Sequence, residues 1–147
     1  MRSAIMVLGA VLCAAAFVPE QAPAGEYFPM PGNQNLPFSE AVRVGSMLYL
    51  AGQLGTDAST NVVAGGIEAE TKQALENIKA ILERHGSSMD RVVKCTVMMA
   101  DMKEWGAMNG VYTTYFTTHL PARSAFGATG LAKGARVEIE CMATIAK

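Results

Sequence analysis

The longest helical pattern in the chain, residues 67–85, most constrains what it can fold into. Its apolar or small side chains recur at helical spacing along one stripe, made of Ile67, Thr71, Ala74, Leu75, Ile78, Ile81 and Leu82. Charged side chains fall on the opposite side, and Gly86 follows as a residue suited to ending a helix. A helix of this kind has to bury its stripe against a second layer, which the rest of the chain should supply.

Segments on both sides of this helix have the patterns of β-strands. They span residues 38–44, 47–51, 91–100, 124–127 and 136–145, and residues 25–37 are expected to form an extended lead-in. A second helical pattern covers residues 103–119, where Gly106 and Gly110 each weaken the helix by about 1 kcal/mol relative to Ala. The order ββ-α-β-α-ββ predicts an α+β fold in which two helices cover one face of a sheet.

The sheet face without helices would carry a mixture of charged and apolar side chains. These are Lys94, Thr96, Met98, Glu138 and Glu140. Such a face is too apolar in parts to lie fully in water. We therefore expect copies of the chain to pack these faces together, with binding sites at the interfaces between subunits.

Composition and spacing argue against several classes of function. The formal net charge of −1 and the lack of a Lys/Arg cluster are unlike a nucleic-acid-binding protein. No group of Cys, His and Asp residues has metal-ligand spacing, so we expect no metal site. Neither His85 nor His119 has a Ser or Cys partner that would indicate a hydrolytic triad.

Residues 1–24 have the features of a secretory signal peptide. A basic start precedes an uncharged, mostly apolar run, and Ala22 and Ala24 are small residues of the kind found before a cleavage site. We expect cleavage after Ala24, export to the periplasm, and a single mature domain at residues 25–147 without a membrane anchor. The alternative is an uncleaved N-terminal anchor.

Two cysteines, Cys95 and Cys141, remain in the expected mature chain. Exported proteins commonly pair such residues in disulfides. Both positions, however, fall on the apolar faces of predicted strands, where a free cysteine packs as a small hydrophobic residue. Two buried thiols are the favoured expectation, and a disulfide is the alternative.

A turn and a strand near the C-terminus carry the candidate chemistry. Arg123 lies within Pro121-Ala122-Arg123-Ser124, and the last strand presents Glu138 and Glu140 on one face. A guanidinium binds a carboxylate through two parallel hydrogen bonds and stays charged in a cleft. Glu138 could hold a water molecule and exchange protons with a substrate. Alternatively, Arg123 pairs with a neighbouring carboxylate and Glu138 is an ordinary interface residue; Glu140 is expected to be structural.

Several stretches of the chain resemble the RidA/YjgF family in order and approximate spacing. They are Gly52-Gln53, residues 77–82, residues 93–97, Asn109-Gly110-Val111-Tyr112, Tyr115-Phe116, Pro121-Ala122-Arg123-Ser124 and Val137-Glu138-Ile139-Glu140. The resemblance covers residues 36–146 and implies a chorismate-mutase-like fold and a homotrimer with clefts between its subunits. It also implies hydrolysis of reactive enamines and imines, such as 2-aminoacrylate and its imine tautomer, to 2-keto acids and ammonia. No cofactor is implied.

The resemblance implies roles for particular residues of this chain. Arg123 would bind the substrate carboxylate, and Glu138 would position or activate the attacking water. Gly52 and Asn109 would line the substrate site. These four positions match the motifs of the family.

Three other substrate-site positions depart from the family. Phe38, Ala51 and Ala125 stand where members commonly have Tyr, Ser and Cys, so the expected pocket is less polar. The departures favour a bulkier or more apolar substrate, or a loss of activity. A non-catalytic binder of small carboxylate metabolites that keeps Arg123 is therefore the alternative to a deaminase. Endoribonuclease activity, described for some members, is disfavoured by the acidic balance and the lack of a catalytic His motif.

Overall fold

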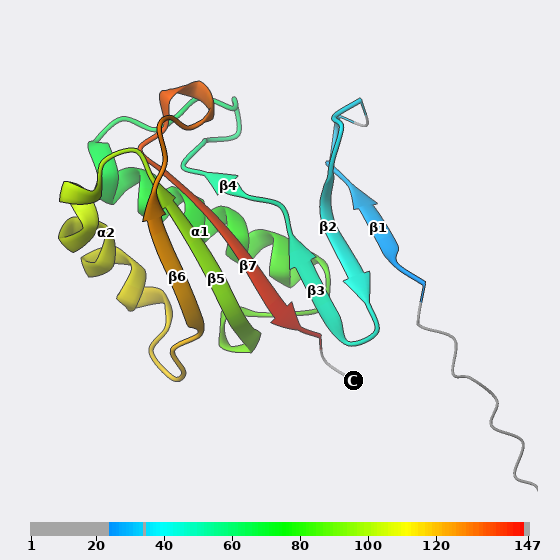
Figure 1. The fold of residues 1–147 in the computed structure, drawn as a ribbon. Coiled ribbons are helices and arrows are strands. Elements are labelled where there is room, and N and C mark those ends of the chain that lie inside the picture. Colours follow the sequence, from blue (N-terminus) through cyan, green and yellow to red (C-terminus); the bar gives the residue numbers. More distant parts are fainter. Residues whose placement is uncertain (1–23, 34, 146–147) are drawn as a thin grey trace, which may run out of the picture.

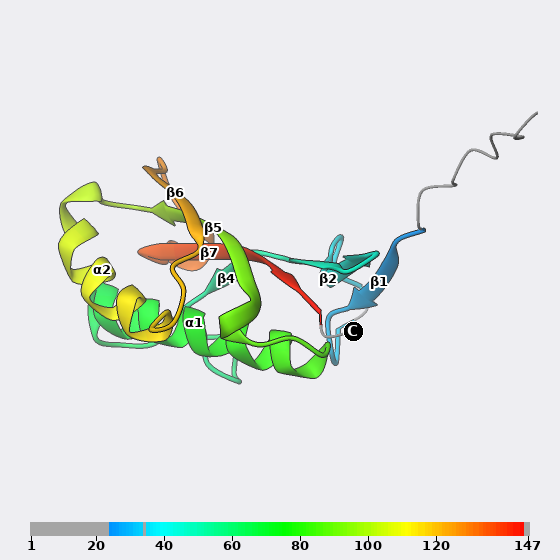
Figure 2. The same cartoon turned by 90° about the horizontal axis from the view of Figure 1, so that it is seen from below.

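The computed structural model describes residues 24–33 and 35–145, so the expected signal peptide lies outside it except for Ala24. Seven strands form one mixed sheet, and two α-helices lie on one side of it (Figures 1 and 2). The elements are β1 (Glu26–Pro29), β2 (Ser39–Val44), β3 (Met47–Leu50), β4 (Gln53–Leu54), α1 (Gly66–Arg84), β5 (Val92–Met99), α2 (Trp105–Tyr112), β6 (Ala122–Gly127) and β7 (Val137–Thr144). The predicted α+β class is confirmed.

The last strand lies in the interior of the sheet. The order is β1-β2-β3-β7-β5-β6, and the short β4 also pairs with β7. β7 runs antiparallel to β3, β4 and β5, whereas β6 lies parallel to β5 at the edge. β1 lies in the expected lead-in, and β4 lies just beyond the strand predicted at residues 47–51. Both are short strands whose formation depends on pairing with β2 and β7, which a pattern within their own sequence does not reveal.

Helix α1 confirms the predicted amphipathic pattern. The expected stripe is buried against the sheet, together with Glu70. Gly65 and Gly66 have positive φ angles of 116° and 76° where the chain enters the helix, and Gly86 has a φ of 77° just beyond its end. The Ser87 amide donates to the Leu82 carbonyl at 2.8 Å, which closes the last turn. No helix in the described part of the chain is long and apolar enough to cross a membrane.

The second helix is shorter than predicted. Continuous α-helix covers only Trp105–Tyr112, with single 3-10 turns at residues 102–104 and 113–115. The Thr113 hydroxyl donates to the Asn109 carbonyl at 3.0 Å, and the Thr114 hydroxyl donates to the Val111 carbonyl at 2.7 Å. Such side-chain bonds compete with the helical hydrogen bonds and favour an early end.

The expectation of two free thiols was wrong, because Cys95 and Cys141 form a disulfide. Both residues do lie on the buried face of their strands, as predicted. The antiparallel register of β5 and β7 places them directly opposite each other, with their Cα atoms 4.1 Å apart. The pattern of each strand gave the correct face, but the pairing of the sulfurs depends on the register between strands.

Candidate functional site

Arg123 belongs to the edge strand β6, and its side chain packs against α2. Its Cζ atom lies 4.6 Å from the centre of the Tyr112 ring and 5.3 Å from that of the Trp105 ring. Cation–π attraction to two aromatic rings orients the guanidinium without using its N–H donors. Within the described residues Arg123 forms no salt bridge, so the alternative of a carboxylate partner in its own chain is not supported. The donors remain available to a ligand.

A cavity of about 380 Å³ opens beside this guanidinium. We call it the arginine cleft, and its lining consists of Asn109, Tyr112, Thr113, Leu120, Pro121 and Arg123. Its size suits a small molecule, since ligand pockets commonly span about 300–1,000 Å³. Asn109 and Arg123 were predicted to belong to one site, and the fold brings them together.

Two polar atoms of the arginine cleft are buried without a hydrogen-bond partner in the described structure. They are Asn109 Oδ1 and the Tyr112 hydroxyl. Burial raises the pKa of Tyr112 to about 12, and the charge of Arg123 partly opposes this shift. The ring below Arg123 therefore stays neutral at physiological pH. Tyr112 was not predicted as a site residue, although it lies three positions after Asn109 and so shares its helix face.

Glu138 lies against Gly52, as the family motifs predicted for two residues of one site. A Cβ atom built on Gly52 would lie only 2.1 Å from Glu138 Oε1, so glycine alone permits this packing. We call Gly52 and Glu138 the glutamate wall. Burial raises the pKa of Glu138 above its ordinary value, and the nearby charge of Glu140 raises it further. Glu138 is thus suited to exchanging a proton closer to neutral pH than an exposed glutamate.

The arginine cleft and the glutamate wall lie on opposite faces of the sheet. In the β5–β6 register Arg123 is beside the buried Cys95, on the side covered by the helices. In the β5–β7 register Glu138 is beside Met98, and alternation along β7 puts it on the same face as Glu140. A single chain therefore does not bring the two predicted catalytic residues together.

We call the arginine cleft and the glutamate wall the two half-sites. Two of the three positions that depart from the family lie in the chain next to one half-site each. Ala125 pairs with the buried Val97 and lies on the Arg123 side of β6. Ala51 directly precedes Gly52, and its amide donates to the Glu40 carbonyl at 3.0 Å. Phe38 precedes β2 and is 51% exposed. A large apolar side chain so exposed is suited to contact with another chain or with a ligand.

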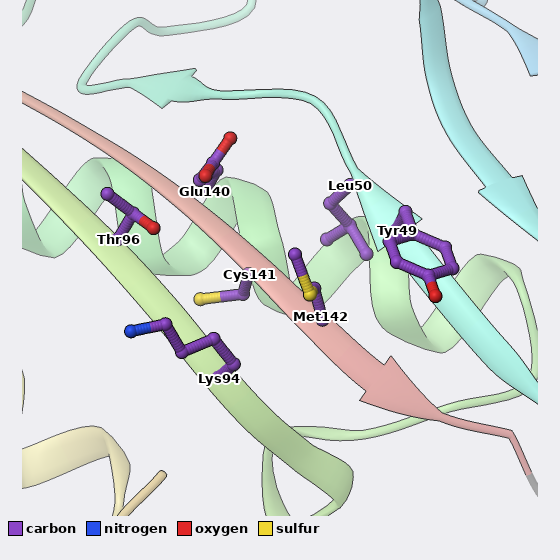
Figure 3. A pocket seen from close by; sticks show the side chains of 7 residues that line it. All are labelled: Tyr49, Leu50, Lys94, Thr96, Glu140, Cys141 and Met142. Atoms are coloured by element: carbon purple, nitrogen blue, oxygen red, sulfur yellow. The ribbon is translucent and has the colours of Figure 1, made fainter. Parts of the chain in front are cut away.

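A smaller hollow of about 120 Å³ lies on the helix-free face, where side chains from β3, β5 and β7 gather (Figure 3). Its lining consists of Tyr49, Leu50, Lys94, Thr96, Glu140, Cys141 and Met142. The Nζ atom of Lys94 donates a hydrogen bond to Ser124 Oγ at 2.7 Å. The ammonium group therefore already has a partner within the chain. The mixture of polar and apolar side chains predicted for this face is confirmed. No cluster of three metal-ligating side chains occurs in residues 24–33 and 35–145.

Comparison with known proteins identifies the family. The family model described as endoribonuclease L-PSP matches residues 32–145. The chain belongs to the RidA/YjgF family. A mouse relative named 2-iminobutanoate/2-iminopropanoate deaminase is 46% identical over 108 residues, which cover 73% of this chain and 80% of that protein.

Solved structures of similar proteins share the fold. That of RidA from the Antarctic bacterium Psychrobacter sp. PAMC 21119 aligns with a TM-score of 0.72 and 35% identity, over 85% of this chain and 99% of that one. Escherichia coli TdcF with bound serine aligns with a TM-score of 0.71 and 28% identity, over 76% of this chain and 90% of that one. A relative of this fold therefore binds a small amino acid, which carries a carboxylate beside a nitrogen-bearing carbon.

Proposed function

We propose that the protein hydrolyses 2-imino acids and their enamine tautomers to 2-keto acids and ammonia. The observation that carries this proposal is Arg123, which two aromatic rings hold beside a small cavity with its donors free of any carboxylate in the described chain. The mouse deaminase, at 46% identity, supports the same reaction class. Its named substrates, 2-iminobutanoate and 2-iminopropanoate, have the carboxylate next to the C=N bond that is cleaved.

The proposed reaction adds one water molecule across the C=N bond. Arg123 binds the carboxylate and so fixes the position of the neighbouring imine carbon. Glu138 accepts a proton as water attacks that carbon and passes it to the nitrogen, which gives a carbinolamine. It then accepts the hydroxyl proton as the C=O bond forms and passes it to the nitrogen as the C–N bond breaks. The products are one 2-keto acid and one ammonia, with no change in oxidation state. These steps use only side chains and water, so cofactor independence is part of the proposal.

The site is proposed to form between subunits of a homotrimer. Because Arg123 and Glu138 lie on opposite faces of one sheet, the arginine cleft of one copy has to meet the glutamate wall of another. Apolar side chains that are exposed in the single chain support such contacts, including Leu120 at 74% and Phe126 at 49%. A contact in which each copy gives one face and receives the other can close into a ring, and the resemblance to the family supports a ring of three subunits.

The side chain of the substrate is proposed to be larger or more apolar than the methyl group of the imino acid derived from alanine. Phe38, Ala51 and Ala125 remove hydroxyl and thiol groups that the family commonly has, and apolar walls disfavour polar substituents. Imino acids derived from branched or aromatic amino acids fit this lining best.

We also propose that the protein acts in an exported form, as a single domain spanning residues 25–147. The signal-like pattern of residues 1–24 supports export to the periplasm. The disulfide between Cys95 and Cys141 is consistent with an oxidising compartment, where such bonds persist.

The test is a coupled assay on residues 25–147. An amino-acid oxidase generates 2-imino acids from a panel of amino acids, and semicarbazide traps the imine that survives. We expect the protein to lower trapping, Arg123→Ala to abolish this effect, and Arg43→Ala to retain it. Arg43 is a matched control because it is a strand arginine whose salt bridge with Glu26 is exposed. Equal trapping with and without protein across the panel, combined with Arg123-dependent binding of 2-keto acids, would establish the carboxylate binder instead.

A further inference from the structure

A buried carboxylate outside both half-sites joins β2 to the end of α1. Glu40 is only 3% exposed, and both of its oxygens accept hydrogen bonds from Arg84 Nη1 at 2.5 Å. His85 Nε2 lies 2.9 Å from Glu40 Oε1, and its ring stacks on Phe28 with centroids 4.2 Å apart. We call Glu40, Arg84 and His85 the ionic node. Such partners offset the free-energy cost of burying a carboxylate.

The backbone of Glu40 extends this node to the glutamate wall. Its carbonyl accepts the Ala51 amide at 3.0 Å, and Ala51 is bonded to Gly52. Gly52 in turn packs against Glu138 so closely that no Cβ atom fits. Phe38, on the other side, is two residues before Glu40 in the chain. The side chain of Glu40 thus anchors β2, and the backbone carbonyl of the same residue accepts the hydrogen bond from the segment that carries Gly52.

We propose that Glu40, anchored by Arg84 and His85, is a positioning residue that holds the Ala51–Gly52 segment against Glu138. It contacts neither substrate nor reacting atoms, and it acts through the packing of that segment. The α1 end provides a rigid support because Arg84 is its last residue and His85 caps it. This inference rests on the proposed function for its kinetic consequence, whereas its structural consequence can be measured without turnover.

Glu40→Gln is the decisive variant, because it keeps the shape of the side chain and removes its charge. The amide cannot accept both Arg84 hydrogen bonds, so the node loosens and the Ala51–Gly52 segment shifts. We expect kcat to fall on the order of tenfold, since small misplacements of catalytic groups are costly, while KM changes less than about twofold. KM should stay close to the wild-type value because Arg123 and the arginine cleft are unchanged.

The matched control is Glu70→Gln. Like Glu40, Glu70 is a buried carboxylate, but it lies on α1. It is 4% exposed, and its side chain accepts a hydrogen bond from the Arg136 amide at 2.7 Å. It belongs to neither half-site. We expect Glu70→Gln to lower the melting temperature without changing kcat at temperatures where it is folded. An equal fall in kcat in both variants would overturn the positioning role and indicate general destabilisation.

Direct titration of Glu138 separates this inference from the proposed function. In protein labelled with ¹³C at glutamate carboxyls, the resonance absent from Glu138→Gln identifies Glu138. If the Ala51–Gly52 segment shields this carboxylate, Glu40→Gln should hydrate it and lower its pKa toward the ordinary glutamate value. An unchanged Glu138 titration in Glu40→Gln would overturn the inference even if the wild type is an active deaminase. A shifted titration in a protein without turnover would retain the positioning role and reject the function.

A milder variant covers the case in which Glu40→Gln does not fold. Arg84→Lys keeps the positive charge on a side chain that is 46% exposed, but loses the guanidinium geometry. We expect the same direction of change in kcat and in the Glu138 titration, with a smaller amplitude. Wild-type values in this variant would count against the node as the source of the positioning.

Discussion

Gly52 lies so close to Glu138 that a single added carbon atom would reach 2.1 Å from the carboxylate oxygen Oε1. The contact involves the end of a flexible side chain, so a larger residue at position 52 would displace Glu138 rather than unfold the chain. The position of the candidate acid/base is therefore determined by the absence of a side chain on the neighbouring segment.

Gly52→Ala should remove activity while leaving the fold intact. We expect kcat to fall on the order of 100-fold, because the displaced carboxylate no longer reaches the attacking water. Gly106→Ala is the control, since a Cβ atom there meets nothing within 4 Å and should stabilise α2 by about 1 kcal/mol. Imine hydrolysis and thermal unfolding are measured on both. Retained turnover in Gly52→Ala would argue against Glu138 as the proton-transfer group.

Arg123→Lys should raise KM more than it lowers kcat. Lysine keeps the charge but cannot form two parallel hydrogen bonds to a carboxylate, and it stacks less well on Tyr112 and Trp105. We expect a KM increase of roughly 10- to 100-fold, corresponding to about 1.4–2.8 kcal/mol of lost binding. Steady-state kinetics with 2-imino acids generated in situ provide the measurement. Arg43→Lys should leave both constants unchanged.

Mixing two inactive variants should restore activity if the site lies between subunits. In an assembly built from one variant alone, Arg123→Ala or Glu138→Ala inactivates every site. A mixed assembly contains interfaces in which an intact Arg123 meets an intact Glu138, roughly one site in four for random mixing. Co-refolding followed by the imine assay measures the recovery. No recovery, with mixed assembly verified by tagged subunits, would contradict a site that combines Arg123 of one subunit with Glu138 of another.

Glu138→Gln should change how stability depends on pH. Burial raises the pKa of Glu138, so the folded state holds a proton that the unfolded state has already lost at intermediate pH. The ionised carboxylate therefore destabilises the fold, and this cost appears as pH rises above about 4, the ordinary glutamate value. We expect the melting temperature of Glu138→Gln relative to wild type to increase from about pH 4 to pH 7. A constant difference over this range would contradict the raised pKa.

The isolated protein should contain the Cys95–Cys141 disulfide, and neither cysteine takes part in the proposed reaction. Intact-mass analysis of protein isolated without reductant should find the chain two hydrogens lighter than the dithiol form, because one S–S bond replaces two S–H bonds. Replacing Cys95 and Cys141 together with Ala should cost about 2–4 kcal/mol of unfolding free energy, measured by urea denaturation. A protein isolated without reductant that carries two free thiols would refute the pairing.

The sequence predicted the elements with strong internal patterns. Helix α1 was predicted to within one residue at each end, because its apolar stripe and the flanking Gly86 are local signals. β1 and β4 were missed because they depend on partners elsewhere in the chain. The disulfide was missed for the same reason, since the facing of Cys95 and Cys141 follows from strand register and not from either strand alone.

The candidate site was predicted by residue but not by arrangement. Arg123, Asn109, Gly52 and Glu138 were predicted to share one site, and within a single chain they lie as two separate pairs. Side-chain alternation puts Glu138 on the helix-free face, as expected, but the face of Arg123 depends on the parallel pairing of β6 with β5. That pairing has no signature in the short strand itself.

The disulfide has a consequence for the chain between its two ends. Residues 95–141 form a covalently closed ring, and this ring contains α2, β6, the arginine cleft and Glu138. A protease that cuts once within the exposed connection near Lys133 would open the ring without releasing a fragment. The nicked protein would run as one species until a reductant separates its two pieces, so every residue with a proposed chemical role stays tethered to the core through a cut in the backbone.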